Sequence, residues 1–473
     1  MTGTMLIDGT WHTPDHHIDV TDPADGSLVG RVGWGDATDA RRAASAAAAA
    51  FDAWADAPAR VRADLLLQAA ELIGERQRSI GELLAREAGK RLPEALAEVA
   101  FSAEYFRWFA EQARRPHGDL LTSEQPGRRQ LTLRRPTGVV ASLTPWNFPC
   151  SIQARKLAPA LAAGCTVVAR VSEKAPLAVT ELIRTLTDAG LPAGVVNLVH
   201  GPAAAITDTL LDHPAVRVVT FTGSTGVGSR IMATAARRIV RPLLELGGNA
   251  AFVVFDDADL DAAVEGAVLA KTRNTGQSCV AANRFLVHER VHDEFAGRLA
   301  ERLDALRIGN GLDEPCPDVG PVIDQSRVDA VTALVDEALA AGACRATDDR
   351  AVPRHGHYVP PTLLVDVPDH ARIAREEVFG PAAAVFRFRD EEEALARANA
   401  TELGLAGYVY SRDPARIWRM ADRMRVGILG ANDPLPSVVF APMGGVKQAG
   451  LGREGAADGL AEFTDQRYLA WRP

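Results

Sequence analysis

This 473-residue chain lacks the features typical of disulfide-rich, zinc-binding and membrane-spanning proteins. The five cysteines are Cys150, Cys165, Cys279, Cys316 and Cys344, an odd number at wide spacing without a C-x-x-C pair. This pattern argues against a disulfide framework or a structural zinc site, so we expect no metal. No apolar run reaches the roughly 18 residues of a membrane helix, and the N-terminus does not read as a signal peptide. We therefore expect a cytoplasmic protein without a membrane partner.

The charge distribution gives no indication of a nucleic-acid partner. The formal net charge is −9, from 52 Lys and Arg against 61 Asp and Glu, and no Lys/Arg block occurs. A nucleic-acid partner is therefore not expected. With 47% hydrophobic and 24% charged residues, the composition is typical of a globular protein of two or three domains.

Helical and strand patterns divide the chain. Residues 38–56 predict an alanine-rich helix capped by Thr38 or Asp39, and helical periodicity continues over 59–114. Residues 128–136 alternate apolar and polar side chains, which predicts a half-exposed strand. We expect it to be an edge strand that pairs with another subunit.

From residue 138 strands and helices alternate, which predicts a mainly parallel sheet that binds a nucleotide at the carboxyl ends of its strands. A second α/β block covers roughly 260–440, and 465–471 predicts a last strand. The expected strands of the first block, starting near 138, include 166–171, 194–201, 216–224, 241–248 and 250–255.

Four segments carry residues suited to chemistry. Cys279 in "NTGQSC" follows small and polar residues, whereas a core cysteine prefers apolar neighbours. A nucleophilic thiol needs such an accessible setting. Asn147 in "TPWNFP" is either a turn cap or an amide donor for an oxyanion. Glu245 in "LLELGG" is either a paired structural carboxylate or a general base. The turn "FTGSTGVG" could face a phosphate, although it lacks the G-x-G-x-x-G spacing.

These segments, together with "EEVFGP" and "GGVKQAGLGREG", resemble the aldehyde dehydrogenase superfamily over nearly the whole chain. The resemblance implies an α/β fold with a Rossmann-type parallel-sheet cofactor domain, a second α/β catalytic domain and a small β oligomerisation arm. It implies that Cys279 attacks an aldehyde, that Asn147 and the Cys279 N–H hold the oxyanion, and that Glu245 activates the water that hydrolyses the thioester. The alternative from another class is a non-catalytic structural relative.

The resemblance also implies a nicotinamide cofactor, NAD with NADP as the alternative. Gly223 and Ser224 would lie by the pyrophosphate. Arg170, where relatives have lysine, could hold the adenine ribose or a 2′-phosphate, whereas Glu173 would repel a 2′-phosphate. The full implied set is Thr144, Pro145, Trp146, Arg170, Ser172, Glu173, Gly223, Ser224, Glu377 and Phe379, the last two at the nicotinamide ribose.

Within the superfamily the chain is most similar to succinate-semialdehyde dehydrogenases. Arg155, Arg273 and Ser437 match the residues that bind the distal carboxylate of their substrate. Met443, where phenylalanine is common, and the loop "DPLPS" depart from that pattern. Glutarate semialdehyde and uncharged or betaine-type aldehydes are therefore alternatives.

The same resemblance suggests a domain plan. A cofactor domain would combine residues 1–117 and 137–247, and a catalytic domain would span 248–455. Residues 118–136 and 456–473 would form an arm that makes a homodimer or homotetramer.

Overall fold

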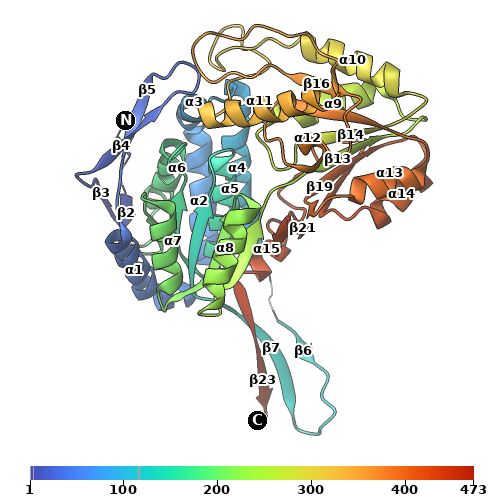
Figure 1. The fold of residues 1–473 in the computed structure, drawn as a ribbon. Coiled ribbons are helices and arrows are strands. Elements are labelled where there is room, and N and C mark those ends of the chain that lie inside the picture. Colours follow the sequence, from blue (N-terminus) through green and yellow to red (C-terminus); the bar gives the residue numbers. More distant parts are fainter. Residues whose placement is uncertain (1, 4, 116–117) are drawn as a thin grey trace.

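The computed structural model describes residues 2–3, 5–115 and 118–473. Two α/β units, each built on its own sheet, lie next to each other, and a narrow β arm projects from the first unit (Figure 1). The predicted boundary between residues 117 and 118 adjoins residues outside the described part. The division into domains stays a prediction.

The first sheet contains the strands that end at the candidate site. Its five central strands, β12, β11, β8, β9 and β10, are parallel, while β22, β2 and β3 pair antiparallel at the two ends. In order across the sheet the strands are Gly450–Leu451 (β22), Arg241–Glu245 (β12), Val216–Thr222 (β11), Val139–Thr144 (β8), Thr166–Val171 (β9), Val196–Leu198 (β10), Met5–Ile7 (β2) and Thr10–His12 (β3).

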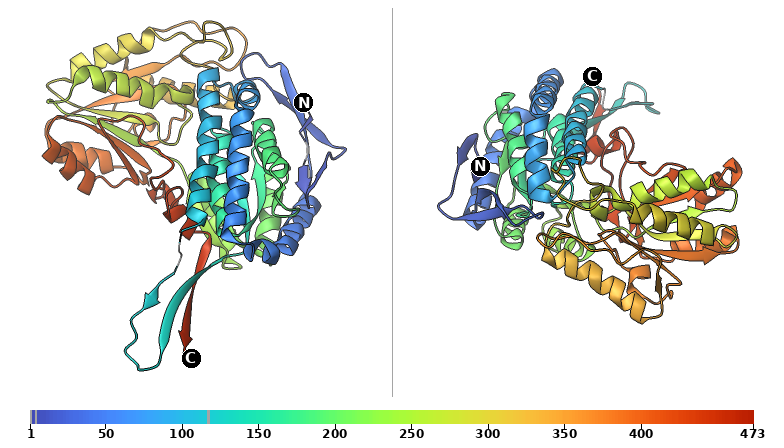
Figure 2. Two further views of the ribbon diagram at one scale, coloured as in Figure 1. Left: turned by 180° about the vertical axis from the view of Figure 1, so that it is seen from behind. Right: turned by 90° about the horizontal axis from the view of Figure 1, so that it is seen from above.

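Helices cover both faces of this sheet. One core joins α1, α7 and α8 to one face, and another joins α5 and α6 to the opposite face. Three long helices, α2, α3 and α4, pack outside α5 and α6 and are prominent in the view from behind (Figure 2). The helices are Ala37–Ala55 (α1), Ala59–Glu75 (α2), Gln77–Ala88 (α3), Leu92–Ala113 (α4), Pro149–Ala163 (α5), Leu177–Asp188 (α6), Ala203–Asp212 (α7) and Thr225–Ala236 (α8).

The predicted cap of the first helix was wrong by two or three residues. Asp36 is the N-cap, and its carboxylate accepts the backbone N–H groups of Thr38 and Asp39. Asp39 reaches back to the N–H of Asp36, which completes a capping box. The sequence contains several residues that can cap at this point, and only the backbone path selects among them.

The second sheet has seven strands, six of them parallel. Apolar cores lie on both of its faces. Its strands, in order, are Cys344–Arg345 (β15), Thr362–Val365 (β16), Ala382–Phe388 (β17), Ala282–His288 (β14), Ala250–Val254 (β13), Ala406–Tyr410 (β19) and Ile428–Ala431 (β20). Its helices are Leu260–Thr272 (α9), His292–Asp304 (α10), Gln325–Ala340 (α11), Arg372–Arg375 (α12), Glu391–Asn399 (α13) and Pro414–Arg423 (α14).

The arm is a three-stranded antiparallel sheet of Leu120–Leu121 (β6), Arg129–Pro136 (β7) and Thr464–Trp471 (β23). β7 lies between the other two, so the prediction that 128–136 forms an edge strand was wrong; β6 and β23 are the edges. Just before β23, Leu460 and Phe463 belong to the core of the first sheet.

The remaining elements are small. None of the described helices is long and apolar enough to span a membrane. All five cysteines are free. The small elements are Thr2–Gly3 (β1), His17–Thr21 (β4) and Leu28–Gly33 (β5) in one sheet, Leu403–Gly404 (β18) and Val446–Lys447 (β21) in another, Asp458–Ala461 (α15), and the short 3₁₀ turn Arg273–Gly276 (η1).

Candidate active site

A cavity of about 210 Å³ lies where the two α/β units meet. The first unit contributes the segments that follow β8, β11 and β12, since the carboxyl ends of parallel strands share one edge of the sheet. The second unit contributes Cys279, Arg327, Glu377 and Phe379. The first unit's lining residues are Pro145, Trp146, Asn147, Thr222, Gly223, Ser224, Leu246 and Gly247.

The turn before Cys279 is strained. Asn274, Thr275 and Gly276 are consecutive residues with φ of 53°, 55° and 72°. A β-branched threonine rarely adopts this left-handed conformation, and such strain collects at functional sites. Gly248 allows the close approach of this segment, because a Cβ there would lie 2.1 Å from the carbonyl oxygen of Cys279.

Cys279 is partly exposed and lines the cavity. It is therefore not packed as a core residue. Burial and the nearby Glu377 carboxylate raise the pKa of its thiol to about 12, while the positive Arg155 opposes the shift. Burial therefore favours the protonated thiol over the thiolate.

Asn147 lies in the loop between β8 and α5. Its side-chain nitrogen donates to the carbonyl of Gln277, two residues before Cys279, at 3.1 Å. Asn274 donates to the backbone carbonyl of Asn147 at 2.9 Å, so the strained turn and this loop hold each other. An amide nitrogen has two N–H groups, and the second is available to a ligand oxygen.

Glu245 is the last residue of β12 and is 3% exposed. Its Oε2 atom has no hydrogen-bond partner among the described residues. Burial and the negative Glu454 raise its pKa to about 8, although Arg155 and Lys156 lower it. Glu245 does not line the cavity itself, but the residues directly after it do. A carboxylate with this pKa can take a proton near neutral pH.

A buried charge cluster behind the site was not found from the sequence. Glu454 forms an ion pair with Arg155, Nε to Oε2 at 2.7 Å, and a second with Lys156. Lys156 also donates to Thr220 at 3.0 Å. The two cations hold the pKa of the Glu454 carboxyl below its usual range despite its burial. The only signal in the sequence is an Arg-Lys pair within a helix whose other residues are mostly apolar.

The residues around the cavity fit a dinucleotide. Ser224 begins α8 without a side-chain cap, which leaves backbone N–H groups of the first turn for an anion. The buried Thr222 hydroxyl has no partner among the described residues. Glu377 accepts the N–H of Gly248 at 3.0 Å, and the ring of Trp146 meets that of Phe379 edge-on at 5.5 Å.

Four residues of the predicted cofactor set lie outside the cavity lining. Thr144 donates to Gln153 at 3.0 Å. Arg170 forms an ion pair with Glu173 at 2.8 Å and donates to the carbonyl of Gly201 at 3.0 Å. Ser172 accepts the backbone N–H of Lys174 at 3.3 Å. The guanidinium of Arg170 is thus already engaged.

The three residues predicted to bind the substrate differ in the contacts that their side chains already make within the protein. Arg155 and Ser437 both contact the sulfur of Met443, Ser437 at 3.8 Å. Arg155 is also paired with Glu454. Arg273 lies over the ring of Phe148, 5.2 Å from its centroid, and forms no ion pair within the described part of the chain. Of the two predicted cations, Arg273 is therefore the one that can still bind a ligand carboxylate.

Comparison with known proteins agrees with this geometry. Residues 11–469 match the aldehyde dehydrogenase family. The chain is 43% identical over 466 residues to an NADP⁺ succinate-semialdehyde dehydrogenase of Escherichia coli, which covers 98% of this chain and 96% of that protein. It is 43% identical over 465 residues to a glutarate-semialdehyde dehydrogenase of Pseudomonas putida, with the same shares covered.

The fold has a solved counterpart. The crystal structure of an NADP-dependent enzyme from E. coli superposes with a TM-score of 0.98 at 42% sequence identity, covering 100% of this chain and 98% of that one. The predicted aldehyde-dehydrogenase-like α/β fold is confirmed.

Proposed function

Because this chain belongs to the aldehyde dehydrogenase family, we propose that it oxidises an ω-carboxylated aldehyde to the acid, with succinate semialdehyde as the first candidate. The observation that carries the substrate class is Arg273. Its half-buried guanidinium has no carboxylate partner among the described residues and lies over Phe148, the neighbour of Asn147. A charge-assisted bond from such a group favours a carboxylate at the far end of the substrate.

The chain's own groups supply the acyl-transfer chemistry. The Cys279 sulfur loses its proton to solvent and adds, as the thiolate, to the aldehyde carbon, and the second N–H of the Asn147 amide together with the Cys279 N–H stabilises the oxyanion. NAD(P), when bound, accepts the hydride from that carbon. The resulting thioester on Cys279 is cleaved by a water whose proton passes to Glu245, which releases the acid and restores the sulfur.

NAD is the favoured cofactor and NADP the alternative. Glu173 would repel a 2′-phosphate and can accept a hydrogen bond from a 2′-hydroxyl. Its pairing with Arg170 at 2.8 Å reduces what that arginine can offer to a phosphate. The E. coli relative named for NADP⁺ keeps the alternative open.

The length of the substrate is a second question about the same pocket. The sulfur of Met443 contacts the side chains of Arg155 and Ser437. A substrate carboxylate would have to displace this sulfur to bind Arg155, Ser437 and Arg273 together. Glutarate semialdehyde, the substrate named for the P. putida relative, is therefore the second candidate.

The test is Arg273→Gln, assayed with succinate semialdehyde, glutarate semialdehyde, propanal and betaine aldehyde, each with NAD and NADP. Losing a charge-assisted bond of about 1.5–3 kcal/mol should lower kcat/KM for the preferred semialdehyde by roughly 10- to 150-fold. Propanal turnover should change little.

Arg354→Gln is the matched control, because Arg354 is exposed and does not line the cavity. If Arg273→Gln and the control gave the same ratio of semialdehyde to propanal activity, carboxylate recognition by Arg273 would be rejected. Cys279→Ala should abolish reduction of the cofactor with every aldehyde.

The domain plan, the cytoplasmic location and a homodimer or homotetramer built through the arm belong to the same proposal. The arm supports assembly because its sheet has two unpaired edges and carries exposed apolar side chains.

A further inference from the structure

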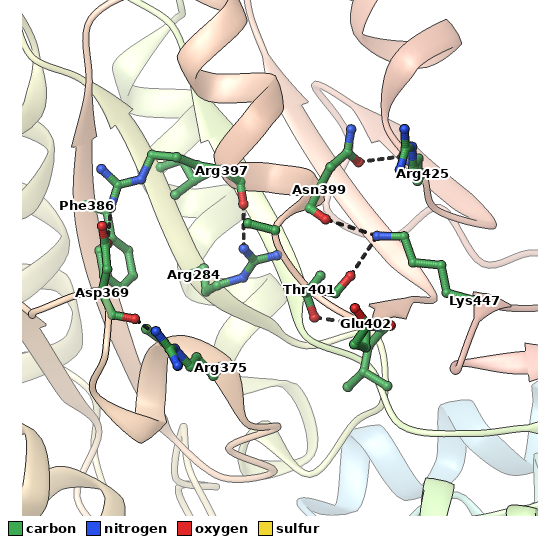
Figure 3. A pocket seen from close by; sticks show the side chains of 14 residues that line it. Arg284, Asp369, Arg375, Phe386, Arg397, Asn399, Thr401, Glu402, Arg425 and Lys447 are labelled. Atoms are coloured by element: carbon green, nitrogen blue, oxygen red, sulfur yellow. Dashed lines mark hydrogen bonds and ion pairs between the residues drawn. The ribbon is translucent and has the colours of Figure 1, made fainter.

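A second, larger cavity of about 770 Å³ lies in the second α/β unit, and Cys279 is not among its lining residues (Figure 3). Its walls come from β14 and β17, from Asp369, from the end of α12, from the end of α13 with the turn after it, from Arg425 after α14, and from β21. The proposed dehydrogenase chemistry uses none of its side chains.

The cavity is basic although the protein is acidic. Five basic side chains line it against two acidic ones, Asp369 and Glu402. The basic residues are Arg284, Arg375, Arg397, Arg425 and Lys447. Of these five basic residues, only Arg397 forms ion pairs with carboxylates of the described residues. The shorter of its two ion pairs is with Asp369 at 2.5 Å. The lining residues therefore carry more positive than negative side chains, and Glu402 is the carboxylate that acts on Lys447.

Backbone carbonyls, not carboxylates, hold two of these cations. Arg284 is 4% exposed and donates to the carbonyls of Asn249, Arg397 and Ala398 at 2.7–3.0 Å. Lys447 donates to the carbonyls of Asn399 and Thr401 at 3.0 and 2.7 Å. Figure 3 shows the bond from Arg284 to Arg397 and the two bonds that Lys447 makes with Asn399 and Thr401. Such contacts fix the cations in place without neutralising them.

Burial and mutual repulsion lower the pKa values of two of these groups. Burial, and then the positive Arg397, lower the pKa of Arg284 to about 10. Burial and the positive Arg425 lower the pKa of Lys447, with Arg284 adding to the effect and Glu402 opposing it. A bound anion would relieve this repulsion, because an opposite charge within a few ångströms favours the charged form of each cation.

We propose that this cavity binds a small polyvalent anion, one with two or more neighbouring negative groups such as a diphosphate or a polycarboxylate. The spread of Arg284, Arg375, Arg425 and Lys447 around one open volume suits several anionic groups better than a single one.

The site touches the back of the catalytic segments. Arg375 stands two residues before Glu377. Arg284 holds the carbonyl of Asn249, and the neighbouring Gly248 donates to Glu377. An anion bound here therefore contacts the opposite side of the segments that line the cofactor cavity.

The test is calorimetric titration of the full chain with inorganic pyrophosphate and, separately, with citrate, in about 0.15 M salt to screen loose surface binding. The protein is saturated with NADH first, so that the cofactor cavity is filled. We expect saturable binding of one anion per chain. The double variant Arg375→Gln/Arg425→Gln, which changes two exposed side chains, should weaken it at least tenfold.

The charge-matched control is Arg41→Gln/Arg354→Gln, two exposed arginines outside the cavity, and it should leave the affinity within about twofold. Lys447→Gln provides an independent weakening variant. Pyrophosphate binding alone identifies phosphate groups as the ligand chemistry, and binding of both probes extends it to polycarboxylates. No saturable binding of either probe, or an equal loss in both double variants, overturns the proposal. A change of oligomeric mass in Arg375→Gln/Arg425→Gln without anion binding also overturns it, because the cavity would then belong to an interface.

Discussion

At the scale of single residues, three acids at the candidate site have raised pKa values. Burial raises the pKa values of the Cys279 thiol to about 12, of Glu245 to about 8 and of Glu377 to about 7. A raised pKa favours the protonated, uncharged form of each of these acids. Arg155 is the cation that opposes the shifts of both Cys279 and Glu245.

Glu245→Gln should separate the two halves of the reaction. An amide cannot take the proton of water, so thioester hydrolysis should slow by about 100- to 10,000-fold while the sulfur still reacts. Rapid mixing should then show one burst of NADH per site followed by almost no turnover. The wild-type hydrolysis rate should rise with pH through about 8, as Glu245 loses its proton.

The same pKa has a consequence for stability. A carboxyl with a raised folded-state pKa stabilises the folded chain below its ordinary pKa of 4.5, and that contribution is lost as the pH rises through about 8. Glu245→Gln should lose this part of the pH dependence, whereas Glu289→Gln at an exposed position should keep it.

A Glu245→Gln enzyme with steady turnover near wild type would exclude Glu245 as the base.

At the scale of elements, the turn η1 carries backbone strain close to Cys279. Three left-handed residues in succession place Cys279 against Gly248, and Asn274 ties the turn to Asn147. Thr275 adds a bond from its hydroxyl to the carbonyl of Gly320 at 3.2 Å. These bonds offset a backbone cost of roughly 1–3 kcal/mol for each strained residue.

Asn274→Ala should reduce activity more than stability explains. It removes the bonds to the carbonyls of Asn147 and Gln277 and replaces a residue that tolerates positive φ. We expect unfolding to become easier by about 1–3 kcal/mol and kcat to fall at least tenfold. The control is Asn197→Ala, which also removes buried backbone-directed bonds, to Gly194 and Asp8, but in the first sheet.

Denaturant unfolding and steady-state kinetics on both variants distinguish the two effects. Equal stability losses with equal kcat values would show that η1 does not position the nucleophile.

The same elements show what the sequence could predict. Period-two and period-3.6 patterns predicted most of the strands and helices, because each depends on neighbours within a few residues. The capping box at Asp36 and the central position of β7 depend on the path of the chain and were missed. The cluster of Glu454 with Arg155 and Lys156 joins residues 298 apart, which no local pattern records. Arg155 matched the motif, yet its engagement with Glu454 and Met443 required the packed structure.

At the scale of the whole molecule, the arm has an apolar face that this chain leaves uncovered. The register places Leu120, Leu131 and Leu469 opposite one another across the three strands. Leu133 and Trp471, each two residues along its strand, share that face. Leu120 is 71% exposed and Trp471 is 53% exposed. A three-stranded sheet projecting from the body with such a face is typical of a surface that a second copy covers (Figure 1).

Leu469→Asp should therefore dissociate the assembly. Each buried leucine contributes about 1.5–3 kcal/mol, and a symmetric dimer contains the substitution twice, so the dissociation constant should rise by roughly 100-fold or more. Sedimentation velocity at micromolar concentration should show a dimer or larger assembly for the wild type and a monomer for the variant. Gln466→Asp is the matched control, since it adds the same charge to the opposite face of β23 and should keep the wild-type mass. A wild-type monomer, or an unchanged mass in Leu469→Asp, would mean that the apolar face of the arm does not hold the copies together.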